Sequence, residues 1–518
     1  MSQRVRSARR VGRPPGRKEG DTPTRGRGGA VIVATVSGVK GLGGVRGGLL
    51  LGLVIVIALA VTGVWNPFPG VWDWVDRSEP ISEPDVLWQQ RVGGTPKSVT
   101  IVGDTVVVEQ RTRTEVRSLA TGAPLWERKA DWSAVAGGDR DAVVAVGKLL
   151  VKGYELLDPT TGAVRRRDGD AVAVWTYRNM LLDARCVAAT DCTLSAWDPR
   201  GTSPLWTAFL PGVSSGLFAD NPGLLGTRRL TAQRIDEGVA GPEAAPPLLG
   251  FPVDGRVHVV DTATGRVVQD VEPGQDERLS VVGGRMLKIR AVSVDGSCQY
   301  AVSARDPATG QEVWRRSGFN LRTADSAGCA QREDPQGARS VLIGVAPDGR
   351  EAVLDGYDGR LLLVDAEGEK LLAVDDRYAL VRSADKDSVI ARELGTGKAR
   401  WTRPAGAKAG AALTPYAAVL TGDKPSRLVA VDPRTGRELV VLRTSANALA
   451  VGPNGMVVGE GREIGYVRFG AGAGAPPPAA PPAGSNGGTG PGPGRTGGAP
   501  DPEDSCGPKR ELCANGNG

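Results

Sequence analysis

Six cysteines and one histidine are the residues whose types could give this chain chemistry beyond folding. Thiolate and imidazole groups ligate zinc, and an activated cysteine or a Ser-His-Asp set performs nucleophilic catalysis. No Cys-x-x-Cys motif occurs and no histidine lies near a cysteine, so the sequence indicates neither a zinc site nor an activated thiol. The single histidine, His258 in the run VHVVD, is expected on a strand face, which argues against multi-histidine metal sites and His-dependent catalytic sets.

The cysteines fall into three neighbouring pairs, Cys186 with Cys192, Cys298 with Cys329 and Cys506 with Cys513. An even number of cysteines outside the cytoplasm favours disulfides. Several connectivities are possible for six cysteines, and we predict the one that joins neighbours. The last pair closes a short loop near the C-terminus, and the sequence does not decide whether that loop is an isolated staple or a docking element.

Two short acidic loops contain the carboxylates that a calcium site would need, Asp355-Gly-Tyr-Asp358-Gly359 and Asp385-Lys-Asp387. Neither continues into the aspartate spacing and closing glutamate of a calcium-binding loop, so both are interpreted as hairpin turns. A phosphate-binding P-loop is also absent. The sequence therefore predicts no metal-binding, cofactor-binding or catalytic residue.

A recurring phrase organises most of the chain: an apolar strand, an Asp-Pro-x-Thr-Gly turn, and a second strand that often carries Trp. It returns at a period of roughly 40 residues, which is typical of radial or solenoid repeat architectures. The eight copies span residues 116–126, 154–164, 194–206, 257–268, 302–314, 361–372, 389–401 and 428–440. Their turn residues include Asp158, Gly162, Asp198, Asp261, Gly265, Asp306, Gly310, Asp432 and Gly436.

Each part of the phrase has a mechanical role. The aspartate accepts hydrogen bonds from the backbone ahead of it, proline fixes φ, and glycine accepts the positive φ at which the chain reverses. A tryptophan in the following strand can wedge between neighbouring sheets, and its burial contributes on the order of a few kcal/mol. Ligand stacking is the alternative role, but recurrence favours packing. These tryptophans are Trp88, Trp126, Trp206, Trp314 and Trp401.

The two ends of the repeat region look complementary. Residues 85–94 resemble the end of a repeat that lacks its beginning, and residues 448–469 form strands without a following turn and Trp. In a β-propeller, an N-terminal strand can complete the last blade and so leave only short, protected edges. We therefore expect ring closure between these segments.

The strand-Asp-x-x-Thr-Gly-x-x-x-Trp phrase resembles the PQQ-type, or quinoprotein-like, β-propeller repeat over residues 85–469. The resemblance implies an all-β, PQQ-like β-propeller. Eight signatures predict eight blades, with seven as the alternative. The copies at 361–372 and 389–401 lie close together, and a further alternative is that one of them belongs to half a blade or shares strands.

The proteins with this type of repeat include both enzymes and non-enzymatic scaffolds. Dehydrogenases of this type hold a quinone and a calcium or lanthanide ion on the propeller axis, use an Asp base, and often have a disulfide between adjacent cysteines. This chain has no adjacent cysteines, and none of its residues can be matched to those ligands. Non-enzymatic relatives, such as the outer-membrane assembly lipoprotein, use the repeat as a scaffold, although this chain lacks a lipobox cysteine. We expect no PQQ cofactor.

The N-terminal region predicts export. Residues 1–46 form a basic tail, 47–66 an uncharged apolar segment and 67–84 a linker. A bilayer core takes about 20 apolar residues, so 47–66 is long enough to span. The basic tail predicts a cytoplasmic N-terminus and an extracytoplasmic propeller. A secretory signal cleaved after Ala58-Leu59-Ala60 is the alternative, and it also exports the remainder.

The sequence specifies the architecture of the protein more closely than its function. Residues 470–518, rich in Gly, Ala and Pro, are predicted to be disordered. The chain outside residues 1–46 is slightly acidic, so no nucleic-acid partner is expected. We expect a membrane-anchored binding scaffold without catalysis, whose partner is another envelope protein or a cell-wall polymer. The alternatives are an exported PQQ-dependent oxidoreductase and an extracytoplasmic sensor.

Overall fold

The computed structural model of the protein describes residues 86–148, 151–188, 191–212, 241–253, 256–324, 326, 328–331, 333, 336–423 and 426–470. All of them belong to the compact unit Ser78–Gly518. The predicted tail 1–46, apolar segment 47–66, linker 67–84 and cysteines Cys506 and Cys513 lie outside the described residues, as does the tail beyond Gly470. Within the described part of the chain, no helix has the length and apolar character needed to cross a membrane.

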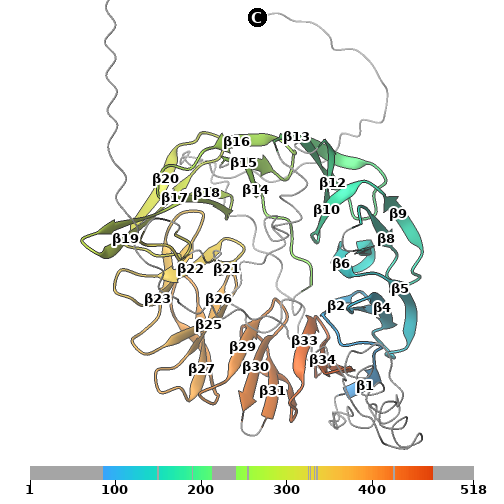
Figure 1. Ribbon diagram of the computed structural model, residues 1–518. Helices are drawn as coiled ribbons and strands as arrows, with labels where there is room; N and C mark the ends of the chain where they lie inside the picture. Colours follow the sequence, from blue (N-terminus) through green and yellow to red (C-terminus); the bar gives the residue numbers. More distant parts are fainter. Residues whose placement is uncertain are drawn as a thin grey trace, which may run out of the picture. The chain divides into compact units, whose positions relative to one another are not determined.

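The described strands form nine antiparallel sheets that follow one another around a ring, each starting near the centre and ending at the rim (Figure 1). We number these sheets as blades 1 to 9. Blade 1 holds β2 (Ser98–Val102), β3 (Thr105–Glu109), β4 (Arg113–Ser118) and β5 (Pro124–Lys129); blade 2 holds β6 (Trp132–Ala136), β7 (Val143–Gly147), β8 (Tyr154–Leu157) and β9 (Val164–Asp168); blade 3 holds β10 (Ala171–Thr176), β11 (Leu181–Ala188), β12 (Asp191–Trp197) and β13 (Pro204–Pro211).

The ring continues through six more blades. Blade 4 holds β14 (Leu248–Val253), β15 (Arg256–Asp261) and β16 (Val267–Val271); blade 5 holds β17 (Glu277–Val282), β18 (Arg285–Val294), β19 (Ser297–Arg305) and β20 (Glu312–Ser317); blade 6 holds β21 (Gln336–Ala338), β22 (Val341–Val345), β23 (Glu351–Asp355) and β24 (Leu361–Val364). Blade 7 holds β25 (Lys370–Val374), β26 (Tyr378–Arg382), β27 (Ser388–Glu393) and β28 (Ala399–Pro404); blade 8 holds β29 (Gly410–Leu413), β30 (Ala418–Asp423), β31 (Ser426–Val431) and β32 (Glu438–Leu442); blade 9 holds β33 (Asn447–Gly452), β34 (Gly455–Glu460), β35 (Glu463–Arg468) and β1 (Val86–Arg91). A short 3-10 helix, η1 (Asp139–Asp141), precedes β7.

Ring closure follows the predicted complementarity of the two ends. β1 pairs antiparallel with β35, and Trp88 lies opposite Tyr466. The expectation that residues 85–94 complete a blade begun by residues 448–469 is therefore confirmed.

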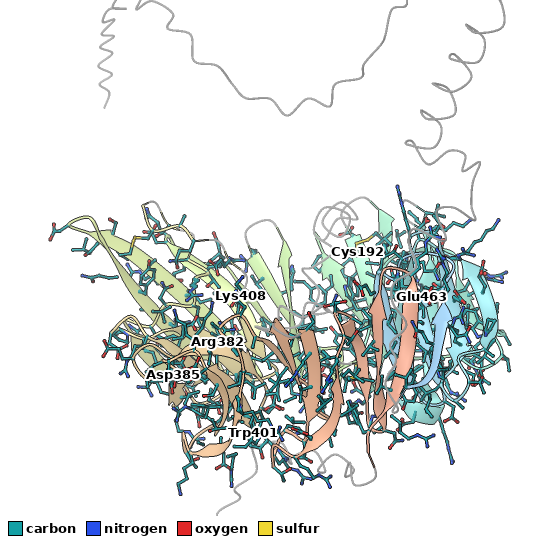
Figure 2. All side chains as sticks on the ribbon, turned by 90° about the horizontal axis from the view of Figure 1, so that it is seen from below. Cys192, Arg382, Asp385, Trp401, Lys408 and Glu463 are labelled. Carbon is teal, nitrogen blue, oxygen red and sulfur yellow. A yellow bond between two sulfur atoms is a disulfide. The ribbon has the colours of Figure 1, made fainter. Side chains whose placement is uncertain are left out.

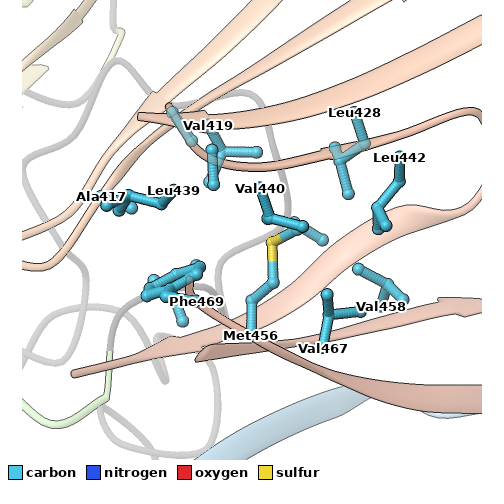
Figure 3. Close-up of a cluster of buried hydrophobic side chains, with 14 of the residues drawn as sticks. Ala417, Val419, Leu428, Leu439, Val440, Leu442, Met456, Val458, Val467 and Phe469 are labelled. Carbon is cyan, nitrogen blue, oxygen red and sulfur yellow. The ribbon is translucent and has the colours of Figure 1, made fainter. Parts of the chain in front are cut away.

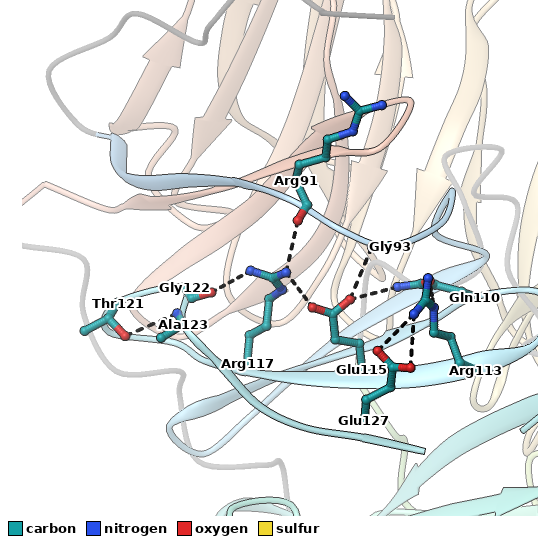
Figure 4. Close-up of polar contacts among 10 residues, drawn as sticks. All are labelled: Arg91, Gly93, Gln110, Arg113, Glu115, Arg117, Thr121, Gly122, Ala123 and Glu127. Atoms are coloured by element: carbon teal, nitrogen blue, oxygen red, sulfur yellow. Dashed lines mark hydrogen bonds and ion pairs between the residues drawn. The ribbon is translucent and has the colours of Figure 1, made fainter. Parts of the chain in front are cut away.

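A buried ion pair supports this closure (Figure 4). The side chains of Arg117 and Glu115 are each 7% exposed and lie 2.5 Å apart. Arg117 donates to the carbonyl oxygens of Arg91, in β1, and Gly122, at distances of 3.0 and 2.8 Å. Glu115 accepts from Gln110 Nε2 at 3.0 Å. A buried charge pair needs further hydrogen bonds to offset its desolvation, and the bonds of both Arg117 Nη atoms supply them, although Arg117 Nε has no partner. The bond to Arg91 ties the closing strand to blade 1.

The predicted count of eight blades, with seven as the alternative, is wrong, because the described strands make nine. Eight blades follow from eight signatures, and the blade built from both chain ends adds a ninth without a signature of its own. The copy assigned to 361–372 was also misplaced. β24 and β25 belong to adjacent blades, and the turn of blade 6 is the acidic loop Asp355–Gly359, where Gly359 N donates to Asp355 O.

Apolar side chains fill every junction between successive blades. The nine main clusters of buried residues each join one blade to the next, including blade 9 to blade 1 and blade 4 to blade 5. Figure 3 shows the junction of blades 8 and 9, where Met456 of β34 reaches toward Val440 of β32. Full burial of one such side chain contributes about 1.5–3 kcal/mol, so the core of the ring is distributed over its junctions.

The repeated tryptophans lie at these junctions and contact the turn of the following blade. A Cβ added at Gly162 would come within 2.8 Å of the Trp126 ring, and one at Gly436 within 2.5 Å of Trp401. Each indole N–H also donates to a carbonyl oxygen of that turn. The pairs are Trp88 to Leu119, Trp126 to Pro159, Trp206 to Thr262, Trp314 to Gly356 and Tyr357, and Trp401 to Pro433.

The turn aspartates bond the backbone that follows them. Asp158 Oδ1 accepts from the amides of Thr160 and Thr161, both at 3.0 Å, and Gly162 reverses the chain at a φ of 69°. Burial disfavours the carboxylate, but Arg165 and these amides outweigh it and lower the pKa of Asp158 to about 2. The same bonds recur at Asp261, Asp306 and Asp432, and Asp198 accepts from Arg200 N.

Replacement of one wedge should destabilise the ring measurably. We expect Trp401→Ala to lower the free energy of unfolding by about 3–5 kcal/mol, because Trp401 is 8% exposed and its removal leaves a cavity against Gly436. Trp401→Phe keeps most of the apolar contact and should cost less. Chemical denaturation measures the loss, and Thr402→Ala, at an exposed neighbour, is the matched control. Equal stability of Trp401→Ala and the control would contradict the wedge role.

Candidate functional site: the hairpin face and its acidic cleft

The ring has two faces that differ in the loops they carry. The Asp-x-x-x-Gly turns and the first hairpin turn of each blade share one face, as shown by the bond from Gly356 N to Ser340 O. We call this the turn face. The opposite, hairpin face carries the turns between second and third strands and the connections from each blade to the next. In the side view of Figure 2, Cys192 lies near the hairpin face and Trp401 near the turn face.

Both disulfides of the described residues stabilise the hairpin face. The predicted pairing of Cys298 with Cys329 is confirmed: it joins the β18–β19 hairpin to the connection between blades 5 and 6. Cys186 is bonded to Cys192 across the β11–β12 hairpin. These two hairpins contain some of the longest strands of the ring, with ten residues in β18 and eight in β11. The third predicted pair lies outside the described residues.

Apolar side chains are exposed around these hairpins. Val187, beside the Cys186–Cys192 bond, is 95% exposed, and Phe209 on the neighbouring strand β13 is 59% exposed. Val294, at the end of the β18–β19 hairpin, is 38% exposed. A disulfide limits the motion of the backbone that presents these side chains, so the hairpin face offers apolar groups at fixed positions.

A segment of the chain runs along the inner side of the ring from blade 1 to blade 3. Residues 241–247, here the crossing segment, lead into β14 from the side of β2 (Figure 1). A Cβ built at Gly241 would lie 4.0 Å from the carbonyl oxygen of Ile101 in blade 1. Further along, Glu243 O accepts from Arg178 N at 2.6 Å, and Ala245 N donates to Asn179 Oδ1 at 2.8 Å, both in blade 3. The crossing segment therefore covers the inner ends of these blades.

A cleft of about 330 Å³ opens on the hairpin face between blades 6 and 7. It is lined by Gly349, Arg350, Glu351, Asp365, Ala366, Gly368, Glu369 and Lys370. The lining comes from the β22–β23 hairpin and from the connection between β24 and β25. Asp365 N donates to Glu351 O at 2.9 Å, and Arg350 Nη1 donates to Asp365 O at 3.1 Å. These two bonds hold the backbone of Asp365 against blade 6.

The three carboxylates of the cleft differ in their partners. Glu351 is 3.3 Å from Arg322 Nη2, and Glu369 is 2.5 Å from Arg392 Nη2. Asp365 is 2% exposed, and its Oδ2 has no hydrogen-bond partner. Burial, and then the negative charges of Glu351 and Glu369, raise the pKa of Asp365 to about 7, although Arg392 opposes the shift.

A second polar cluster lies within the junction of blades 2 and 3. Arg166 stands four residues after the turn of blade 2, where other blades have Trp, and its Cζ lies 3.9 Å from the Trp197 ring centroid. Arg166 Nη2 donates to Tyr154 Oη at 2.5 Å, and Tyr154 donates to Asp183 Oδ2 at 2.8 Å. Burial raises the pKa of both Tyr154 and Asp183. The groups bond one another within the junction, which indicates a structural role.

The remaining candidate residues occupy structural positions. His258 is 7% exposed on β15, with its Nδ1 3.7 Å from Asp270 Oδ1. Asp355 Oδ1 accepts from Tyr357 N, and Asp385 Oδ1 from Asp387 N, as hairpin turns require. No three His, Cys, Asp or Glu side chains of the described residues come together as a metal site would require.

Sequence analysis missed the acidic cleft. Asp365 lay inside the copy assigned to 361–372, so its carboxylate was interpreted as part of a repeat turn. A usable signal was present, because Asp365-Ala-Glu-Gly-Glu369 has three acidic residues and no hydrophobic residue larger than alanine between two apolar strands. The contribution of Glu351 could not be found in this way, since it depends on the pairing of β23 with β24.

Part of the repeat region matches a known protein family. Residues 299–456, from β19 to β34, match the family model described as "Outer membrane protein assembly factor BamB". The chain carries PQQ-type propeller repeats. No curated protein is similar enough to count as a match.

Solved structures with related repeats include BamB from Moraxella catarrhalis, at 16% identity and a TM-score of 0.31 over 70% of this chain and 97% of that chain. The quinohemoprotein alcohol dehydrogenase ADHIIG from Pseudomonas putida HK5 has 11% identity and a TM-score of 0.36, over 76% and 78%. The computationally designed Ika8 protein has 13% identity and a TM-score of 0.36, over 74% and 100%. Similarities at this level carry no information on function.

The PQQ-type repeats raise the question of whether a quinone and its metal would fit. The crossing segment lies against inner strand β2 and the first turn of blade 3, on the side of the ring that faces the axis. Calcium takes several oxygen ligands at once. No three His, Cys, Asp or Glu side chains of the described residues come together to supply such a set.

Asp365 makes stability depend on pH. Between about pH 4 and its raised pKa of about 7, the folded protein retains a proton that the unfolded chain has lost, so stability falls as pH rises through this window. We expect Asp365→Asn to raise Tm by about 2–4 °C at pH 8 and to change it little at pH 4. Scanning calorimetry at both pH values measures this, with the exposed Asp385→Asn as control. A pH-independent effect of Asp365→Asn would contradict the assignment.

The two disulfides should differ in their contributions to stability. Loop-closure entropy predicts a loss of about 4 kcal/mol for Cys298→Ser/Cys329→Ser, whose cysteines are 31 residues apart, and about 2 kcal/mol for Cys186→Ser/Cys192→Ser, with a separation of 6. Denaturation of the two double variants tests the order, and peptide mapping without reductant tests the pairing. Recovery of mixed pairs would show that the assignment is wrong.

Proposed function

We propose that this protein is a membrane-anchored, extracytoplasmic β-propeller that binds another envelope protein and does not catalyse a reaction. The observation that carries the proposal is the hairpin face, where one disulfide fixes the β11–β12 hairpin beside the exposed Val187 and Phe209. A second disulfide fixes the β18–β19 hairpin, which presents Val294. Large apolar side chains held at fixed positions lose little entropy on binding and are suited to protein interfaces.

The absence of catalysis is proposed from the axis of the ring. The family's enzymes hold a quinone there, and in this chain the crossing segment lines the inner side of blades 1 and 3, which would face such a group. The single histidine is buried on a strand, and the carboxylate with the most unusual environment, Asp365, lies on the hairpin face away from the axis. These features support a binding role over an oxidoreductase.

An envelope partner is proposed from three features. The matched family model is described as an outer membrane protein assembly factor. The sequence places a basic tail at 1–46 and an apolar segment at 47–66 before the ring, which is the order expected for a chain anchored with its propeller outside. A disulfide between Cys298 and Cys329 is suited to that compartment.

Crosslinking in intact cells tests the binding role. We expect the full chain to capture a specific envelope protein, and we expect Val187→Asp/Phe209→Asp to reduce its recovery about tenfold, because charges would replace apolar contacts. Val164→Asp is the matched control: Val164 is 43% exposed on β9, beside the turn face. Quantitative mass spectrometry of the captured proteins gives the ratio.

Two results would overturn the proposal. One is equal recovery of every protein by the hairpin-face variant, the Val164→Asp control and the unaltered chain. The other is catalysis: dye-linked oxidation of alcohols by the purified chain after addition of PQQ and Ca²⁺ would establish an enzyme.

A further inference from the structure

We propose that the acidic cleft between blades 6 and 7 binds a cationic side chain, the ammonium group of lysine or the guanidinium of arginine, presented by the protein partner. This inference rests on the proposed function, because the partner is the source of the side chain. It adds a chemical specificity that the apolar hairpins cannot provide.

The first argument is that one carboxyl oxygen of Asp365 has no partner, so that ionisation of this group is uncompensated. Glu351 and Glu369 each have an arginine partner, whereas Asp365 Oδ2 has none. The side chain is almost completely buried in the lining of the cleft. An unpaired carboxylate in such a position is costly, and a cation that enters the cleft would offset this cost.

The second argument is that no cationic side chain of the described structure forms an ion pair with Asp365. Arg350 lines the cleft but forms its ion pair with Asp348, at 2.5 Å, and donates to the backbone oxygen of Asp365. Lys370 is exposed and forms no ion pair in the described structure, so it is the one resident cation that could compete with a ligand. Backbone bonds at both ends of Asp365 limit any movement of its carboxylate toward solvent.

The third argument concerns the type of cation. Calcium and magnesium need several convergent oxygens, and the described carboxylates do not converge as a metal-binding group. An ammonium or guanidinium group needs only one or two charge-assisted hydrogen bonds. A cleft of about 330 Å³ also has room for the aliphatic stem of such a side chain.

The position of the cleft links it to the rest of the hairpin face. Arg322, the partner of Glu351, lies in the connection between blades 5 and 6, which contains Cys329 and is closed by the Cys298–Cys329 disulfide. Its amide donates to Asn320 Oδ1 at 2.7 Å, and its carbonyl oxygen accepts from Glu333 N at 3.1 Å. The disulfide-bonded loop thus holds the positive charge of Arg322 beside the cleft, on the face that would meet the partner.

Saturation-transfer NMR with the full chain in detergent tests the proposal. The probe is the capped peptide Ala-Lys-Ala at about 1 mM, a concentration suited to a weak single-side-chain site. We expect saturation transfer to the lysine methylenes of this peptide and none above background for the same peptide carrying Nε-acetyl-lysine. Asp365→Asn should weaken binding about tenfold through loss of a charge-assisted hydrogen bond.

Two variants serve as controls. Asp385→Asn removes an exposed carboxylate from the hairpin face of blade 7 and should leave binding unchanged. Lys370→Gln removes the competing cation and should strengthen binding. Equal binding by Asp365→Asn and the unaltered chain would overturn the proposal, as would equal binding of the acetylated peptide. Displacement of the peptide by calcium chloride at constant ionic strength would assign the carboxylates to a metal and would also overturn it.

The outcome is separable from that of the proposed function. If a partner is captured through Val187 and Phe209 but the lysine peptide does not bind, only the cleft is wrong. If the peptide binds and no partner is captured, the cleft remains a cation site and the scaffold role fails.

Discussion

The contact between an indole and the turn of the following blade is the interaction on which the rest of this ring depends. Each tryptophan covers a turn glycine and donates its N–H to a carbonyl oxygen of the same turn, as Trp126 does toward Gly162 and Pro159. The contact requires a glycine at the end of the turn, and it recurs at five of the nine junctions between the described blades. Because the wedge fixes the spacing of blades, it also fixes which loops meet on the opposite face.

Polar features occur at two of the junctions that lack a tryptophan wedge. At the junction of blades 2 and 3, Arg166 stands in the tryptophan position and stacks on Trp197. At the junction of blades 6 and 7, Leu363 stands there, and Gly397 of the next turn has nothing within 4 Å. The acidic cleft opens on the other face of this same junction. Loss of the tryptophan does not by itself produce a polar feature, because Val440 occupies that position at the apolar junction of blades 8 and 9.

The sequence predicted what local chemistry determines and missed what depends on three-dimensional pairing. The turn residues, the closure of the ring by residues 85–94 and the Cys298–Cys329 pair follow from spacing and side-chain type. The number of blades did not, because blade 9 is built from both chain ends and has no signature of its own. The complete cleft could not be predicted either. The sequence shows that Asp365 is an acidic residue in a loop, but Glu351 comes close to it only through the pairing of β23 with β24.

Closure by β1 has a consequence for the order of events during synthesis. β1 is the first strand of the ring to be made, and its partner β35 is the last. At about 5–20 residues per second, translation of the intervening chain takes on the order of a minute or less. During that interval the edge that β1 will occupy does not exist, and Trp88 can at most contact the turn of blade 1. β1 therefore remains an unpaired edge strand until β35, the last strand of the propeller, has been synthesised.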